Sequence, residues 1–350
     1  MSDIPAPLCL ITGGSGFLGI NLTRSLLSRG YAIRTLDIEP FNFPEQSQID
    51  ARLGDVRSVQ QVDSAMCDVC VVVHCAAALP LASPAEIAST TIDGTHILLE
   101  AAKRHGVPRF VFISTTAVYG IPNHYPVFET DPLQGVGPYG CAKIRAEQWC
   151  ISYRSPSLSV TVLRPKSFVG AERLGAFELL FDWAFDGRNF PVLGTGDNLY
   201  QLLDVEDLCE AILLCITLHS DRVSTTFNVG AKQFGTLRQS FQAVLDRAGH
   251  GGRVVSLPQR PAQWLLCLLE LMRLSPLYRW IYASASHTSV VSTRLIEANT
   301  GFSPRYSNVQ ALVRNYDWYV AHRKEIQSRL GITHRAPWRH GVLALAKYLF

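Results

Sequence analysis

A glycine-rich turn near the start of the chain restricts the possible folds more than any other feature. An apolar run over 8–11 leads into Thr12-Gly13-Gly14-Ser15-Gly16-Phe17-Leu18-Gly19, and a stretch with helical periodicity follows. Glycines allow a tight turn and a close backbone approach to a pyrophosphate, and the next helix offers free N–H groups and its positive dipole end. The pattern predicts a strand, a phosphate-binding turn and a helix, with Gly13, Gly16, Phe17, Leu18 and Gly19 beside a dinucleotide.

An acidic residue at the end of the next expected strand indicates which dinucleotide is bound. The strand over 32–36 is followed by Asp37, 18 residues after Gly19. This is near the spacing typical of the acid that holds the adenosine ribose. A carboxylate accepts hydrogen bonds from both ribose hydroxyls and repels a 2′-phosphate, so we expect NAD rather than NADP.

Strand and helix patterns alternate through the rest of the first half. Strands are expected over 69–74 and 109–114, with a helix over 95–104 between them. This alternation predicts an α/β fold with a Rossmann-type, doubly wound parallel sheet. Ligands of such sheets lie at the carboxyl ends of the strands. Asp37, the segment His74-Cys75-Ala76-Ala77 and the pair Ser114-Thr115 should therefore meet at one edge.

A tyrosine and a lysine further along the chain have the spacing of a proton-transfer pair. Gly137 and Pro138 open an expected helix in which Tyr139 and Lys143 lie one turn apart on the same face. A nearby ammonium favours the ionised form of a phenol and moves its pKa toward the working pH of an acid/base catalyst. Tyr139 is therefore a candidate proton shuttle.

Composition excludes several classes of protein. Charged residues make up 17% of the 350 residues and the net charge is +3 without blocks of like charge, so no nucleic-acid partner is expected. The nine cysteines are scattered, and Cys67 and Cys70 lack a second pair at ligand spacing, so no metal site is predicted. The first residues show no secretory signal, which favours a cytoplasmic location. A small-molecule substrate is the expected partner.

Five segments together resemble one family. The chain is similar to the extended short-chain dehydrogenase/reductases, the NAD-dependent epimerase/dehydratase family, in Thr12 to Gly19, His74 to Ala77, Ser114-Thr115-Thr116-Ala117-Val118-Tyr119-Gly120, Tyr139 to Lys143 and Leu163-Arg164-Pro165. The resemblance covers about 8–240. It implies that Tyr139 is the catalytic acid/base and that Lys143 tunes it and binds the nicotinamide ribose. Thr115 is implied to bind the reacting oxygen, with Ser114 as a second candidate.

The resemblance also implies contacts to the cofactor and the substrate. Further cofactor contacts are implied for Asp55, which matches the acid near the adenine, and for Val56, Cys75, Ala76, Ala77 and Pro165. Substrate contacts are implied for Thr116, Ser167 and Arg173. The family usually has asparagine at the position of Thr91, where it supports the active-site geometry. We expect the reaction class to survive this replacement.

The chain is expected to form two domains and a tail. Residues 1–165 form the NAD-binding domain, to which 199–230 return; 166–198 and 231–330 form a smaller α/β substrate domain, and 331–350 an amphipathic tail. In UDP-sugar epimerases of the family an asparagine takes the position of Ser167 and an arginine that of Gln201. Both diphosphate anchors are therefore replaced in this chain, and Arg173 and Arg188 are alternative cations.

An apolar stretch in the second half bears on the substrate. Trp264 to Met272 is apolar on nearly every helical face and too short to span a bilayer. It fits a helix that is buried or faces a second subunit, a helix in contact with a membrane surface, or a lid over an apolar substrate. Its place in the chain resembles that in 3-beta-hydroxysteroid and sterol dehydrogenases, and 337–350 is a second short amphipathic segment.

The sequence therefore predicts an NAD-dependent oxidoreductase. Hydride passes between nicotinamide C4 and the carbon of a ring secondary alcohol, while Tyr139 moves the hydroxyl proton and Thr115 holds the oxygen. The replaced anchors and the apolar helix favour a sterol-like or lipid-linked substrate and peripheral membrane contact. One alternative is a UDP-hexose 4-epimerase or dehydratase with tightly bound NAD, and another is a non-catalytic NAD-binding assembly subunit. A homodimer is expected, because dimers through two helices per subunit are common in the family.

Overall fold

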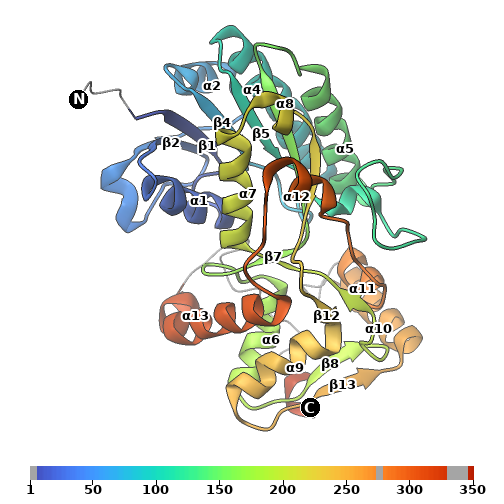
Figure 1. Ribbon diagram of the computed structural model, residues 1–350. Coiled ribbons are helices and arrows are strands. Elements are labelled where there is room, and N and C mark those ends of the chain that lie inside the picture. Colours follow the sequence, from blue (N-terminus) through green and yellow to red (C-terminus); the bar gives the residue numbers. More distant parts are fainter. Residues whose placement is uncertain (1–5, 273–278, 329–345) are drawn as a thin grey trace.

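A seven-stranded parallel sheet forms the centre of the upper domain in Figure 1. The computed structural model describes residues 6–272, 279–328 and 346–350. The strand order is β11-β6-β5-β4-β1-β2-β3, and each neighbouring pair is parallel. The elements of this domain are β1 Leu8–Thr12, α1 Phe17–Leu27, β2 Ala32–Asp37, β3 Asp50–Leu53, α2 Val59–Met66, β4 Val71–His74, α3 Pro84–Ala88, α4 Gly94–Arg104, β5 Arg109–Ile113, α5 Gly137–Ser152, β6 Ser159–Pro165, α7 Val205–Thr217, α8 Ser220–Val223, β11 Thr226–Val229 and α12 Arg294–Thr300.

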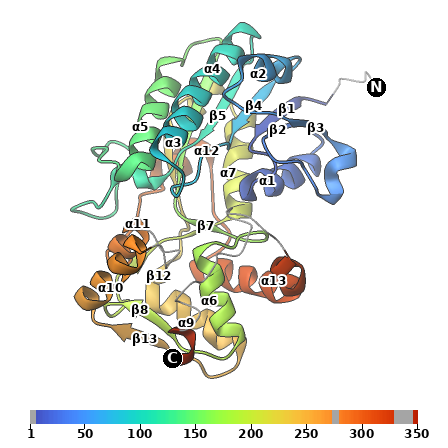
Figure 2. The same ribbon diagram turned by 180° about the vertical axis from the view of Figure 1, so that it is seen from behind.

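Helices cover both faces of this sheet (Figures 1 and 2). On one face α1 and α7 contribute buried residues such as Leu22 and Leu208, and on the other α4 and α5 contribute Leu98 and Ala146. Strands covered on both faces need apolar side chains on both faces, which explains the continuous apolar runs of β4 and β5 and much of the low charge content. The Rossmann-type fold predicted from the sequence is confirmed.

The chain changes direction across the sheet between β1 and β4. From β1 it passes outward through β2 and β3, and it then returns to β4 on the other side of β1. At such a point the loops after the two strands diverge and leave room for a ligand. The loop after β1 is the glycine turn, and the loop after β4 begins at Cys75. The predicted cofactor segments therefore meet at this point.

The second domain lies below the carboxyl edge of the sheet (Figure 1). Its core includes Phe181, Leu245, Leu312 and Tyr319. The predicted tail over 331–350 lies outside the described residues except for 346–350. The elements of this domain are β7 Phe168–Val169, α6 Ala176–Phe185, β8 Phe190–Leu193, β9 Leu199–Tyr200, β10 Leu203–Asp204, β12 Gly235–Thr236, α9 Leu237–Ala248, β13 Val254–Leu257, α10 Gln259–Leu271, α11 Arg279–Ser284, α13 Asn308–Ser328 and a 3-10 turn at Lys347–Leu349.

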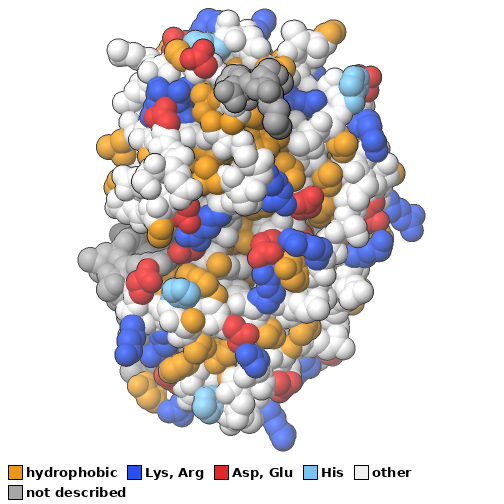
Figure 3. Space-filling view, turned by 60° about the vertical axis from the view of Figure 1, so that its left-hand side comes forward, with side chains coloured by type: hydrophobic (Ala, Val, Ile, Leu, Met, Phe, Trp, Pro, Cys, Tyr) orange, Lys and Arg blue, Asp and Glu red, His pale blue; other side chains and the backbone are white. Residues whose placement is uncertain are grey.

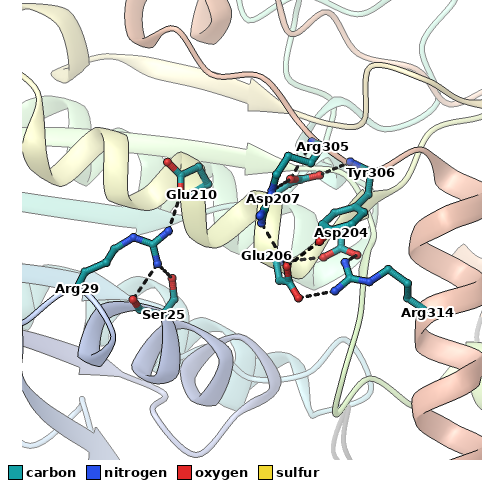
Figure 4. Close-up of polar contacts among 9 residues, drawn as sticks. All are labelled: Ser25, Arg29, Asp204, Glu206, Asp207, Glu210, Arg305, Tyr306 and Arg314. Atoms are coloured by element: carbon teal, nitrogen blue, oxygen red, sulfur yellow. Dashed lines mark hydrogen bonds and ion pairs between the residues drawn. The ribbon is translucent and has the colours of Figure 1, made fainter.

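Ion pairs hold the start of α7 against α13 of the second domain (Figure 4). Asp204 caps α7: its Oδ1 accepts a hydrogen bond from the Glu206 N–H at 2.8 Å, and its Oδ2 lies 3.0 Å from Nη1 of Arg314. Glu206 binds the other Arg314 nitrogen at 2.5 Å and the Tyr306 hydroxyl at 3.0 Å. Because α7 packs on the sheet and Arg314 belongs to α13, this cluster fixes the position of one domain against the other.

The apolar helix α10 is exposed along its length. None of its residues is buried, and Trp264 and Leu271 are 83% and 80% exposed. The sequence allowed a buried helix, a helix facing a second subunit, a helix on a membrane surface or a lid. This exposure excludes the helix buried within the subunit. Within the described part of the chain, no helix combines the length and apolar character that crossing a bilayer requires.

Candidate active site

The glycine turn after β1 brings backbone N–H groups to the point where the chain changes direction. Gly13 has a φ of +72°, and a Cβ there would lie 2.7 Å from the backbone nitrogen of Ala76. A Cβ at Gly19 would lie 2.2 Å from the Gly13 oxygen. Gly16 is the exposed N-cap of α1 and supplies no side-chain cap. The first N–H groups of α1 are therefore suited to bind an anion.

The residues that flank this turn are apolar or small. Phe17 and Leu18 are buried in the core, so they hold the start of α1 in place. Cys75, Ala76 and Ala77 are half-buried after β4. Burial raises the pKa of the Cys75 thiol to about 12, so this side chain remains a neutral thiol at neutral pH.

Asp37 ends β2 directly beside the glycine turn. Its Oδ2 accepts a hydrogen bond from the Ser15 N–H at 2.9 Å, and its Oδ1 accepts one from the Glu39 N–H at 3.0 Å. Burial raises the pKa of the Asp37 carboxyl group, and the two N–H donors oppose that shift. A carboxylate has about four lone-pair sites, so the positions left by these donors fit a pair of ribose hydroxyls.

Asp55 and Val56 follow β3 at the same edge. The Gly54 N–H donates to the Asp37 carbonyl at 2.7 Å, which places the two acidic segments side by side. The Asp55 carboxylate lies 2.5 Å from Nη2 of Arg57, and this ion pair lowers the pKa of Asp55. Val56 is buried. The acid predicted near the adenine thus lies on the β3 side of the glycine turn.

Tyr139 and Lys143 lie one turn apart in α5, above the end of β5. Lys143 is 2% exposed, and its Nζ donates to the Ile113 carbonyl at 2.8 Å. The same Nζ lies 6.0 Å from the centre of the Tyr139 ring. Burial lowers the pKa of Lys143 to about 8. A cation held at this position favours the phenolate form of Tyr139, as proton transfer near neutral pH requires.

The two hydroxyl candidates after β5 have different surroundings. Ser114 is 4% exposed and donates to the Glu147 carboxylate, which also binds Arg164 with a shortest distance of 2.6 Å. Thr115 is half-buried, and its Oγ1 accepts from the Ala117 N–H at 3.1 Å. The Thr115 hydroxyl can still donate its proton, whereas the Ser114 proton is already used. The geometry therefore favours Thr115 as the group that meets a reacting oxygen.

A buried chain of hydrogen bonds links β1, β4 and α4 below these groups. Thr12 Oγ1 lies 2.7 Å from Nδ1 of His74, and His74 Nε2 lies 3.0 Å from Thr95 Oγ1. The Thr95 hydroxyl donates to the Thr91 carbonyl at 2.5 Å, so it must accept from His74. Nε2 of His74 therefore carries a proton. Burial, assisted by the charge of Lys143, lowers the pKa of His74 to about 3.

Thr91 joins this series of hydrogen bonds through its backbone carbonyl alone. The hydroxyl of Thr91 is buried and has no hydrogen-bond partner among the described residues. The sequence placed His74 at the edge of the sheet but did not predict its hydrogen-bond partners. Thr12 and His74 end two strands that are neighbours in the sheet, and this placement could have indicated that their side chains meet.

Comparison with known proteins identifies the family. The model of the NAD dependent epimerase/dehydratase family matches residues 9–230, which include the glycine turn, Asp37, Tyr139 and Lys143. The chain belongs to the NAD-dependent epimerase/dehydratase family. It is accordingly an NAD-dependent enzyme, and the open start of α1 and the Asp37 carboxylate fit the pyrophosphate and the adenosine ribose of NAD.

Relatives within this family act on different substrates. The uncharacterized protein y4nG of Sinorhizobium fredii is 33% identical over 97% of this chain and 85% of its own length. A dTDP-glucose 4,6-dehydratase of Streptomyces niveus is 29% identical over 90% of this chain and 93% of its own length. The human sterol-4-alpha-carboxylate 3-dehydrogenase is 28% identical over 65% of this chain and 61% of its own length. The epimerase Mth375 of Methanothermobacter thermautotrophicus has the same fold, with a TM-score of 0.78, 21% identity, and coverage of 92% and 94% of the two chains.

The two positions at which the sequence resemblance implies diphosphate anchors have other surroundings here. Ser167 is exposed after β6. Gln201 is 2% exposed, and its amide donates to the Ala231 carbonyl and accepts from the Val291 N–H, each at 2.8 Å. The Gln201 side chain therefore links two backbone segments and is not available to bind an anion. Neither position supplies a cation.

The remaining predicted residues lie in different parts of the structure. Pro165 is buried at the end of β6, and Thr116 is half-buried directly after Thr115. The Arg173 guanidinium lies 5.5 Å from the centre of the Phe17 ring, at the start of α1. Arg173, a predicted substrate contact, thus lies beside the cofactor end of the site. Arg188 lies over the Tyr348 ring in the second domain.

Proposed function

We propose that this enzyme transfers hydride between NAD and the carbon of a ring secondary alcohol, with Tyr139 as the general acid/base. The observation that carries this proposal is the buried Lys143 ammonium, held by the Ile113 carbonyl beside the Tyr139 ring. When bound, NAD supplies the hydride acceptor or donor at its nicotinamide ring.

Three side chains share the proton chemistry. In the oxidative direction the Tyr139 oxygen takes the hydroxyl proton, and the Lys143 ammonium stabilises the phenolate. The Thr115 hydroxyl donates to the substrate oxygen as charge develops on it. The Ser114 hydroxyl remains with Glu147 and helps to hold the end of β5 against α5.

A lipid-borne ring alcohol is the substrate class that we propose. The positions of the diphosphate anchors are occupied by an exposed serine and by a glutamine bonded to the backbone. The helix α10 presents apolar side chains to the surface. The human relative that is named for a sterol substrate shows that this family includes such chemistry.

A nucleotide-sugar 4-epimerase or dehydratase is the second candidate, because relatives of this chain are named UDP-glucose 4-epimerase and dTDP-glucose 4,6-dehydratase. In that case NAD stays bound and is regenerated in every cycle. Elimination of water would need a further acid/base group besides Tyr139. Thr116 and Ala117, which follow Thr115, carry no carboxyl group. A dehydratase would therefore need a carboxyl group from another segment of the site.

Cofactor turnover separates the two candidates. The purified enzyme would be mixed with excess NAD and a panel of 3-hydroxysterols, polyprenyl-diphosphate sugars and UDP-hexoses, with absorbance at 340 nm and product NMR as readouts. The first candidate predicts net NADH with an apolar alcohol. Interconversion of UDP-hexoses with NAD retained and no net NADH would establish the second candidate instead.

We also propose a homodimer in the cytoplasm. The α5 helix exposes Ile151 and Trp149, which are 46% and 38% exposed and suited to a contact between subunits. Cys67, Cys141 and Cys267 are exposed free thiols, which a reducing compartment keeps reduced. Light scattering should give the mass of a dimer, and an Ile151→Asp variant should give a monomer. A monomeric native enzyme would refute the assembly.

A further inference from the structure

The α10 helix turns a mainly apolar face outward. The side chains turned outward are Trp264, Leu265, Leu268, Leu271 and Met272, which are 83, 57, 50, 80 and 57% exposed. They recur at the three- and four-residue spacing of one helical face. A surface helix of a water-soluble domain normally turns its polar face outward.

Two polar side chains of α10, Gln263 and Glu270, turn toward α11. Gln263 is half-buried and donates to the Tyr282 carbonyl at 3.2 Å. Glu270 is also half-buried, and its carboxylate accepts from the Tyr282 hydroxyl at 2.5 Å. These bonds fix the rotation of α10, so the outward direction of its apolar side chains is built into the fold.

The exposed charges that the structure describes in the segment that includes α10 are positive. Over 253–272, where the structure describes the side chains, the charged residues are Arg253, Arg260 and Glu270, and Glu270 is bound by Tyr282. Both arginines are exposed, Arg260 within α10 and Arg253 directly before β13, the strand that precedes α10. By contrast, the face that carries α1 and α13 mixes positive and negative side chains (Figure 3). An apolar helix face flanked by arginines is complementary to a surface of lipid tails and anionic headgroups.

We infer that the outward face of α10, made by Trp264, Leu265, Leu268, Leu271 and Met272, docks on an anionic lipid bilayer. The inference deepens the proposed function and rests on it, because docking gives the site access to a substrate held in the membrane. The aliphatic side chains enter the boundary between headgroups and acyl chains, Trp264 lies at headgroup depth, and the arginines face the headgroups.

A second copy of this chain fits the same face less well. In a twofold symmetric dimer the same patch meets itself, so the arginines of one protomer would lie near those of its partner. Such a contact needs acidic residues at its rim, and Glu270 is turned inward. A bilayer rich in phosphatidylglycerol supplies negative charge at every point of the rim.

Flotation with vesicles tests the docking independently of turnover. The NAD-loaded enzyme would be mixed with vesicles of phosphatidylcholine alone or with 30 mol% phosphatidylglycerol. We expect at least a tenfold higher bound fraction with the anionic vesicles, and a tenfold or greater loss of binding in Trp264→Ser/Leu271→Ser. The control Val309→Ser/Val320→Ser removes two exposed apolar side chains from α13 in the same domain and should bind as the native enzyme does. Arg253→Gln/Arg260→Gln should remove the preference for anionic lipid.

The docking and the proposed function can fail separately. Absence of vesicle binding by the native enzyme, or equal binding by the α10 variant with a native melting temperature, overturns the docking. A change from dimer to monomer in the α10 variant, seen by light scattering, also overturns it and assigns the face to a second subunit. Vesicle binding by an enzyme that interconverts free UDP-hexoses, at a rate unaffected by the α10 substitutions, upholds the docking but refutes the lipid-borne substrate.

Discussion

The Lys143 ammonium donates a 2.8 Å hydrogen bond to the carbonyl of Ile113, the last residue of β5, within a site where it is almost completely buried. Burial lowers its pKa to about 8, so at pH 7 the folded protein holds a charge that would be more stable in water. A cation kept at such a cost is expected where it serves the chemistry of the site.

The first prediction separates activity from stability at this position. Lys143→Met should lower turnover by about 100-fold or more, because Tyr139 loses the charge that favours its phenolate. The same change should raise the free energy of unfolding at pH 7 by roughly 1–3 kcal/mol, since a desolvated charge is removed. Urea unfolding and turnover assays measure both effects. Lys324→Met, at an exposed position of α13, should change neither, and a loss of stability in Lys143→Met would contradict this account.

The second prediction uses the neutral His74. Its pKa is about 3 when folded and about 6.5 when unfolded, so the unfolded chain takes up a proton first as the pH falls. The contribution of His74 to stability is therefore complete above pH 6.5 and is lost as the pH falls toward 3, at about 1.4 kcal/mol per pH unit. Urea unfolding between pH 7 and 4.5 should show a shallower loss for His74→Asn than for the native enzyme. Equal slopes would show that His74 is charged in the fold.

The third prediction concerns the choice between the two hydroxyl groups after β5. Thr115→Val should reduce turnover by about 100-fold, because a donor to the reacting oxygen is lost. Ser114→Ala should keep most of the turnover but lose about 1–3 kcal/mol of stability, since the buried Glu147 carboxylate loses a donor. Both variants would be compared by turnover and by urea unfolding. The opposite pattern would give Ser114 the role assigned to Thr115.

The fourth prediction concerns the cofactor. Asp37→Asn should weaken NAD binding about tenfold or more, because a carboxylate that accepts from both ribose hydroxyls is replaced by an amide. Binding of NADP should improve relative to NAD, since the negative charge that repels a 2′-phosphate is gone. Calorimetric titrations with each dinucleotide measure the ratio. An unchanged preference for NAD would show that a residue other than Asp37 binds the ribose.

Features encoded by short spacings could be predicted from the sequence. The glycine turn, Asp37 after β2 and the Tyr139–Lys143 pair each depend on residues within one or two adjacent elements, so the fold and the family followed from them. The Ser114–Glu147–Arg164 cluster joins the residue after β5 to residues of α5 and β6. Nothing local in the sequence states that these three side chains meet.

The orientation of α10 also depends on distant contacts. The sequence shows a helix that is apolar on nearly every face, and this pattern fits burial as well as exposure. The direction is decided by Gln263 and Glu270, which bond to Tyr282 in another helix. The interpretation as a buried helix was excluded only by the resulting exposure of Trp264 and Leu271.

The turnover of Tyr139→Phe tests the central claim most directly. Stopped-flow turnover with whichever substrate the panel identifies would be measured alongside calorimetric titration of NAD. The account predicts that turnover is abolished while the affinity for NAD stays within about twofold of the native value, because only the oxygen that carries the proton is removed. Unchanged turnover in Tyr139→Phe would contradict the role of Tyr139 as the acid/base.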